Sequence, residues 1–175
     1  MAEQAESLAS GRLRPGRILT PGTWIGGIAV TAAAAGTRLW AGSPVALIHS
    51  LGRADTLPPL WLMGLLWLSA FFLFGCTAGT VLTGRTGGPV LSAWRFRGGM
   101  YFLLSVMPAL MWYPLLFSAS LLWLSLVCLC VSAGCAAVCG LCWLRVSRLS
   151  LVTVGLYLFW TVFLFFLQLF TLLAR

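Results

Sequence analysis

The spacing of the charged residues constrains this chain more than any other feature, because it leaves long apolar runs that carry no charge. Uncharged runs of 20, 29 and 26 residues occupy positions 18–37, 56–84 and 149–174. A helix needs about 20 residues to cross the hydrocarbon core of a bilayer, so each run is long enough for one crossing. A fourth run, 98–144, has 47 residues and would form a helix of about 70 Å. We expect it to turn back once, near Pro114, because proline ends or kinks a helix.

The composition agrees with an integral membrane protein of the all-α class. Hydrophobic residues make up 61% of the chain and charged residues 8%, whereas soluble domains carry about a quarter charged residues. A single domain over residues 21–175 is expected to follow a flexible polar tail over residues 1–20. We predict a bundle of five transmembrane helices at about 21–40, 58–82, 98–114, 118–144 and 149–173.

The basic residues set the expected orientation in the membrane. All eleven are arginine, and eight of them fall in the tail, the second loop and the fourth loop, which share one side of a five-crossing chain. The positive-inside rule then places the N-terminus inside and the C-terminus outside. The net charge of +8 suits membrane lipids with anionic headgroups as partners. A nucleic-acid partner is disfavoured, because the arginines are scattered between apolar blocks.

The N-terminal region has a second interpretation. Residues 1–36 would be a signal peptide if the chain were cleaved within TAAAAG. The long polar start with two glutamates, and the glycines that interrupt the apolar stretch, favour a membrane helix instead. The longest predicted connection follows this helix, over about residues 41–57. Loops of this length serve as lids, binding segments or plain tethers.

The sequence offers little for metal binding or hydrolysis. Cys139 and Cys142 form a CxxC pair, but they lie in the small-residue run SAGCAAVCGLC, which suits close helix packing better than a zinc site. The single histidine, His49, leaves little room for histidine catalysis or for a haem with two histidine ligands. No Ser–His–Asp grouping, carboxylate pair or phosphate loop occurs in the sequence. We therefore expect no metal site and no required cofactor.

Two helical stripes combine aromatic rings with small or polar groups. Glycine lets a backbone or a flat ligand approach closely, and a glutamine that faced lipid would be left without hydrogen bonds. Both stripes are therefore expected to face the interior of the bundle. At 100° per residue, members of each stripe fall within about 80° of one another. The first stripe consists of Gly64, Trp67, Phe71 and Gly75, with Trp61 just off it near the membrane surface. The second stripe consists of Tyr157, Trp160, Leu164 and Gln168.

A plainer interpretation is that these rings pack against one another or form interfacial belts, where tryptophan and tyrosine are enriched. Trp24, Trp40, Trp94 and Trp143 lie near the predicted membrane edges, and we assign them to such belts. Trp67 and Trp160 differ from these four. Each lies several residues inside its helix, on the same face as small or polar groups.

With these motifs in order along the chain, the sequence resembles the TspO/MBR family of translocator proteins and tryptophan-rich sensory proteins. The resemblance runs from the first predicted helix to the end of the chain. It is carried by Pro58-Pro59-x-Trp61-x-x-Gly64-x-x-Trp67, by Trp112-x-Pro114-x-x-Phe117, by Tyr157-Leu158-x-Trp160-x-x-Phe163, and by Trp123 and Trp143 at the two ends of the fourth helix.

The resemblance implies a five-helix bundle, often dimeric, that binds tetrapyrroles such as porphyrin or haem in a pocket under the first loop. Some members also bind sterols and benzodiazepine-type ligands. Trp67 and Trp160 correspond to two pocket tryptophans of the family, and Trp112 would line the third-helix side. A bacterial cell membrane is the expected location, with the mitochondrial outer membrane as the alternative. The predicted ligand-binding residues are Trp67, Trp160, Trp112, Phe71, Tyr157, Gly64, Gln168 and Trp61.

The chain departs from the family pattern at four places. An asparagine of the third helix is Ala109 here, which removes a polar anchor for a ligand. An asparagine late in the last helix becomes Gln168, and an aspartate of the fourth helix corresponds to Val127. The sterol motif near the C-terminus lacks its tyrosine, since LQLFTLLAR offers only Phe170 and Arg175. Such sterol motifs are weak patterns even when they are intact.

The leading functional hypothesis is a membrane protein that senses, sequesters or transports a porphyrin-like ligand between indole rings. His49 or Arg53, in the predicted lid, would meet the propionate groups. A second hypothesis, implied by the resemblance alone, is an enzyme that degrades porphyrin in light through the paired pocket tryptophans. A third is a structural protein without a small ligand, which binds another membrane protein through its small-residue helices. We expect a binding protein rather than an enzyme.

Overall fold

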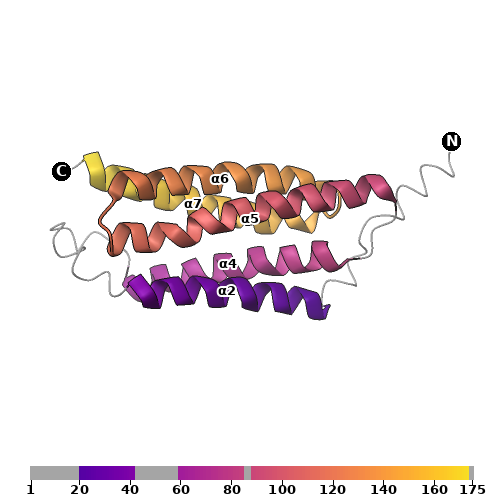
Figure 1. Cartoon of the computed structure of the whole chain (residues 1–175), viewed down its shortest axis with the longest axis horizontal. Helices are drawn as coiled ribbons and strands as arrows, with labels where there is room; N and C mark the ends of the chain where they lie inside the picture. The colour runs from indigo at the N-terminus through magenta and orange to yellow at the C-terminus, as the bar shows by residue number, and fades with distance from the viewer. Residues whose placement is uncertain (1–19, 42–58, 85–87, 174–175) are drawn as a thin grey trace.

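The computed structural model describes residues 20–41, 59–84 and 88–173, and this part of the chain is all-α (Figure 1). Four of its helices are long and apolar enough to cross a membrane, whereas the first is less apolar. The helices are α2 (Pro21–Ala41), α4 (Leu60–Thr83), α5 (Pro89–Phe117), α6 (Leu122–Leu144) and α7 (Leu149–Leu173).

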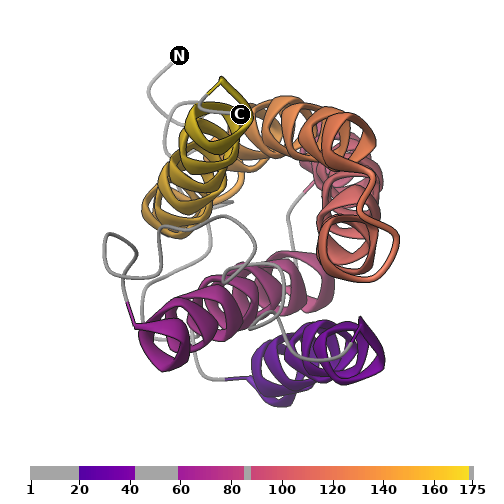
Figure 2. The ribbon, with the colours of Figure 1, turned by 90° about the vertical axis from the view of Figure 1, so that its left-hand side faces the viewer.

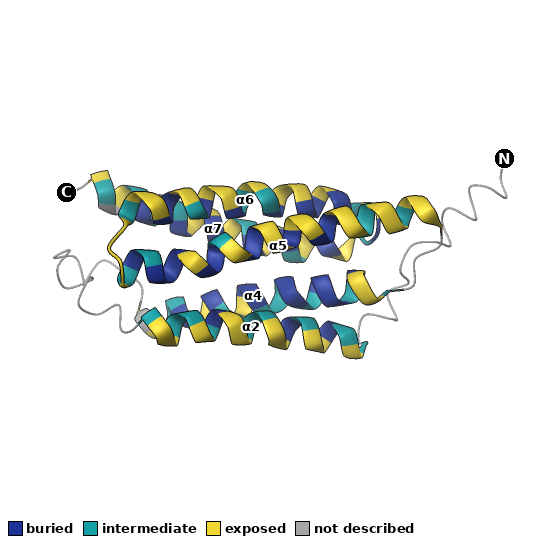
Figure 3. Cartoon of the chain, in the orientation of Figure 1, coloured by how far each residue is buried: buried dark blue, intermediate teal, exposed yellow. Residues whose placement is uncertain are grey.

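The helices follow one another around a ring (Figure 2). Viewed end-on, α4, α7, α6 and α5 each pack against the next, and α2 lies against α4 and α5. The start of α2 and the end of α7 lie at opposite ends of the bundle (Figure 1). The outward faces remain exposed (Figure 3), yet they carry large apolar side chains such as Leu103 and Phe159. Apolar residues on the outside are expected of helices surrounded by lipid.

The packing of α2 on α4 depends on glycines spaced four apart on both helices. A Cβ atom added to Gly26 would lie 2.5 Å from the Gly75 carbonyl oxygen, and one added to Gly75 would lie 2.5 Å from the Gly26 carbonyl oxygen. One turn further, a Cβ atom on Gly79 would overlap the Gly22 carbonyl. The two backbones are therefore in direct contact, as small residues at this spacing permit in lipid. The Thr23 and Thr80 hydroxyls, 2.8 Å apart, join the same two helices.

The expected start of the third helix at residue 98 is wrong, because α5 begins at Pro89 and contains two arginines. Arg95 donates a hydrogen bond of 2.7 Å to the Gly84 carbonyl just after α4. Arg97 lies over the Trp94 ring, with its guanidinium carbon 5.7 Å from the ring centroid. An arginine can keep its charged end at the membrane surface while its stem covers apolar residues, so a charge need not end a helix.

The chain turns back once near Pro114, as expected, but the corner is not at the proline itself, because α5 continues through it to Phe117. The Ser118 N–H donates to the Pro114 carbonyl, and the chain reverses at Ser120, which has a positive φ of 54°. The fourth helix therefore begins at Leu122, rather than at the predicted residue 118. Proline removes one N–H donor from a helix, and within a bundle this loss is tolerated.

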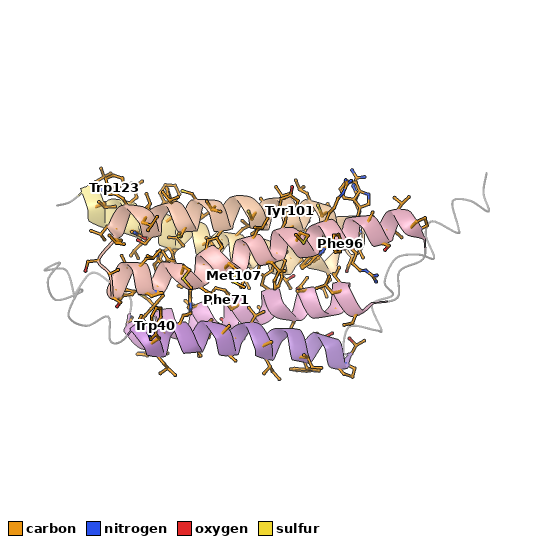
Figure 4. The ribbon with its side chains drawn as sticks, in the orientation of Figure 1. Trp40, Phe71, Phe96, Tyr101, Met107 and Trp123 are labelled. Carbon is orange, nitrogen blue, oxygen red and sulfur yellow. The ribbon has the colours of Figure 1, made fainter. Side chains whose placement is uncertain are left out.

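Trp143 is not part of an interfacial belt. It is fully buried, and its ring stacks on Phe102 with centroids 5.7 Å apart. Gly98 makes this possible, since a Cβ atom there would overlap the indole. Trp40 is exposed, as predicted, and Figure 4 places it at the same end of the bundle as the exposed Trp123.

The glycine contact between α2 and α4 predicts a difference between two matched substitutions. Alanine normally stabilises a helix by about 0.5–1 kcal/mol relative to glycine. Gly134→Ala, where nothing lies within 4 Å of the added atom, should keep or raise the midpoint of thermal unfolding in detergent. Gly75→Ala should lower it, because overpacking costs about 1–3 kcal/mol. Equal midpoints for the two variants would contradict the backbone contact.

Candidate functional site

The two aromatic stripes predicted from the sequence meet inside the bundle. Trp67 is 6% exposed and Trp160 is 8% exposed, so neither indole faces lipid. Phe71, on the inner side of α4 (Figure 4), contacts Tyr157 of α7 edge-to-face, with ring centroids 5.7 Å apart. α4 and α7 run in opposite directions (Figure 1), and Trp67 and Trp160 each lie about one turn from this contact, toward the same end of the bundle. The two tryptophans are therefore at the same depth.

Trp112 of α5 joins the Trp67 side of this group. The centroids of their rings are 5.0 Å apart, with 39° between the ring planes. Phe71 also contacts Trp67, with the two ring centroids 4.7 Å apart. Three helices thus contribute to one buried aromatic cluster. Ring contacts join Trp67, Phe71, Trp112 and Tyr157, and Trp160, one turn along α7 from Tyr157, belongs to the same buried core.

Gln168 faces the interior, as predicted, and ties three helices together. Its side chain is 3% exposed. The Trp112 Nε1–H of α5 donates to Gln168 Oε1 over 2.7 Å. Gln168 Nε2 donates to the Leu122 carbonyl oxygen over 2.8 Å and to Ser125 Oγ over 2.6 Å, both on α6. Because the amide has a partner on each side, its burial is compensated.

A second buried polar chain holds Tyr157 in place. Ser105 Oγ of α5 donates to the Ser132 carbonyl oxygen of α6 over 2.9 Å. Ser132 Oγ lies 2.9 Å from the Tyr157 hydroxyl of α7, at hydrogen-bond distance. The aromatic cluster therefore rests on side chains whose orientations are fixed by hydrogen bonds from neighbouring helices.

Within the described part of the chain, three buried polar groups around the cluster have no acceptor for their hydrogen. They are Trp67 Nε1, Trp160 Nε1 and the Tyr113 hydroxyl. A buried donor that lacks a partner costs about 1–3 kcal/mol, so such groups are rare in folded proteins. All three can donate a hydrogen bond to an acceptor that enters from outside the chain.

Arg38 also belongs to this region, although the sequence pattern indicated only that an uncharged run ends there. It lies in the last turn of α2, and its guanidinium covers Gly64 so closely that a Cβ atom there would overlap it. The same guanidinium lies beside the Tyr113 hydroxyl. Gly64 lies on the aromatic stripe, one turn before Trp67. A glycine at this position indicated that another group approaches α4 closely, but helical periodicity does not identify that group as Arg38.

The remaining predicted site residues fall in different places. Gly64 is buried, but Trp61 is 69% exposed in the first turn of α4, away from the buried cluster. His49 and Arg53 lie outside the described residues. Among the departures from the family pattern, Ala109 is buried in α5, whereas Val127 is on the outside of α6.

Comparison with known families gives one match. The sequence model of the TspO/MBR family matches residues 19–173 of the 175-residue chain. No curated protein and no solved structure matches the chain.

The Gln168 hydrogen bonds predict a coupled loss of stability. Gln168→Leu should lower the free energy of unfolding by about 1–3 kcal/mol, because it leaves the buried Trp112 N–H without an acceptor. Trp112→Phe should also destabilise, but the double variant should lose less than the sum of the two single losses. Thermal unfolding of all four proteins in one detergent measures this. Strict additivity would show that the bond does not contribute.

Proposed function

Because the chain belongs to the TspO/MBR family, we propose that this membrane protein binds a flat, porphyrin-like ligand at the aromatic cluster of α4, α5 and α7. The observation that carries the proposal is the set of unpaired donors on Trp67, Trp160 and Tyr113. A core built only for packing has no need of them. A ligand with acceptor atoms would supply their missing partners and so recover the free energy that burial has cost.

The chemistry of the cluster suits a macrocycle. Indole and phenyl rings bind flat aromatic surfaces through dispersion and through stacked or edge-on contacts. Few polar groups are needed to fix the orientation of such a ligand, and the cluster offers few. Ala109, in the place of the family asparagine, makes the α5 side more apolar. Porphyrins or haem are therefore favoured over ligands that depend on an amide at this position.

We also propose that α2 crosses the membrane, which makes five crossings. Its 21 residues span about 31 Å, close to the thickness of the hydrocarbon core. It lies along α4 from the Gly22–Thr83 contact to the Arg38–Gly64 contact. A helix in contact with a membrane-spanning helix over this length lies at the same depth in the bilayer. With five crossings, the arginine distribution favours an inside N-terminus and an outside C-terminus, in a bacterial cell membrane.

Sensing, sequestration and transport all begin with the same binding step, so binding is the step to test first. Degradation of the ligand in light would begin from the same complex and would add a chemical product. A purely structural role would require no complex at all. Titration in the dark therefore separates the structural role from the others, and illumination of the complex then separates degradation from binding.

A porphyrin titration of the purified protein tests the proposal. Protoporphyrin should quench tryptophan fluorescence with a saturable midpoint. Trp67→Phe and Trp160→Phe, which remove one N–H donor each, should each weaken binding about tenfold, equivalent to about 1.4 kcal/mol. Trp123→Phe is the matched control, because Trp123 is exposed on the outside of α6. Midpoints that are unchanged in both site variants would refute binding at this cluster.

A further inference from the structure

We infer that the ligand carries a carboxylate, and that the Arg38 guanidinium and the Tyr113 hydroxyl hold it at the outer edge of the aromatic cluster. This inference rests on the proposed binding function, and it adds the two residues that hold an acid group of the ligand and the direction in which the ligand lies. It gives Arg38 the contact with the acid group that, from the sequence, was expected of His49 or Arg53.

The position of Arg38 is built into the packing of the helices. The glycine contact between α2 and α4 brings the last turn of α2 against the first turns of α4. Gly64 has no side chain, so the guanidinium lies directly over the α4 backbone. Any larger residue at position 64 would displace it. The arginine is therefore directed inward by its surroundings, rather than extended toward the headgroups.

The surroundings of the guanidinium contain no negative charge in the part of the chain that the structure describes. The three acidic residues of the protein, Glu3, Glu6 and Asp55, all lie outside that part. A half-buried guanidinium within a membrane protein is costly unless an anion or several acceptors compensate it. Guanidinium groups bind carboxylates through two parallel hydrogen bonds, which makes a carboxylate a suitable partner.

Tyr113 supplies the second contact. Its side chain is more than nine-tenths buried, and its hydroxyl proton has no acceptor among the described residues. The rings around it are apolar, with the Phe117 centroid 4.5 Å away and the Trp112 centroid 6.1 Å away. The Arg38 guanidinium lies close enough to donate to the hydroxyl oxygen, but it has only donors and cannot accept the hydroxyl proton. A carboxylate oxygen between the two groups would accept from both.

The order of these groups along α4 gives the ligand a direction. Gly64 lies one helical turn before Trp67, and Phe71 lies one turn after it. An acid group at Arg38 would therefore lie nearer the start of α4, close to the membrane surface, with the ring system deeper in the bundle. This arrangement keeps a charged group out of the centre of the bilayer. It disfavours neutral ligands such as sterols, which have a hydroxyl but no anionic group to pair with the arginine.

The test compares protoporphyrin IX with its dimethyl ester, which has the same ring system but no carboxylate. Both are titrated in the dark against the purified full-length protein, with protein-free micelles as the blank. The wild type should bind the diacid at least about tenfold more tightly than the ester. Arg38→Gln should bring the two affinities together by weakening the diacid far more than the ester, whose carbonyl oxygens accept hydrogen bonds but carry no charge. Tyr113→Phe should reduce the preference, and Arg38→Lys should keep part of it, since lysine retains the charge without the paired donors.

Arg97→Gln is the matched control, because Arg97 is an exposed arginine near the start of α5, at the other end of the bundle. It should keep the full preference for the diacid. Equal affinity of the wild type for diacid and ester would overturn the carboxylate contact while leaving the proposed function in place. An Arg38→Gln variant that loses both ligands equally would show a structural role for the arginine and would also overturn the inference. Binding of neither compound to the wild type would overturn both proposals.

Discussion

The direct backbone contact between α2 and α4 is the interaction on which the rest of this structure depends. Hydrocarbon gives no hydrophobic driving force for helix association, so close packing has to supply the attraction. Glycines on both helices allow this approach, and it is the approach that carries Arg38 onto Gly64. The same contact holds α2, which is less apolar than the other described helices, against the strongly apolar α4. One feature of the sequence, small residues at a spacing of four, thus sets both the packing of α2 and the edge of the candidate site.

Polar side chains have a different role on the opposite side of the bundle. Gln168 connects α7 to α5 and α6, and Ser132 connects Ser105 to Tyr157. Where lipid offers no hydrogen bonds, each polar group needs a partner within the protein, and this requirement fixes how neighbouring helices are rotated. The aromatic residues of the candidate site therefore have defined orientations, although most of their contacts are non-directional.

The sequence alone was sufficient for the all-α class, for the family and for the burial of Trp67, Trp160 and Gln168, because helical periodicity reports which residues share a face. It did not locate the helix ends. Arg95 and Arg97 lie inside α5, and Pro114 continues it, since tertiary contacts compensate for a charge or a lost donor. Trp143 was misjudged, and Arg38 was missed, for a related reason. Their positions depend on Gly98 and Gly64, which belong to other helices, and no pattern within one helix reveals such neighbours.

The three donors without partners have a consequence for the life of the protein in a cell. A compound that binds the folded chain and not the unfolded chain shifts the folding equilibrium by mass action. Proteases and chaperones remove membrane proteins in proportion to the time they spend unfolded. With the proposed ligand, the steady-state amount of this protein would follow the supply of that compound, so that scarcity shortens the lifetime of the protein and plenty prolongs it.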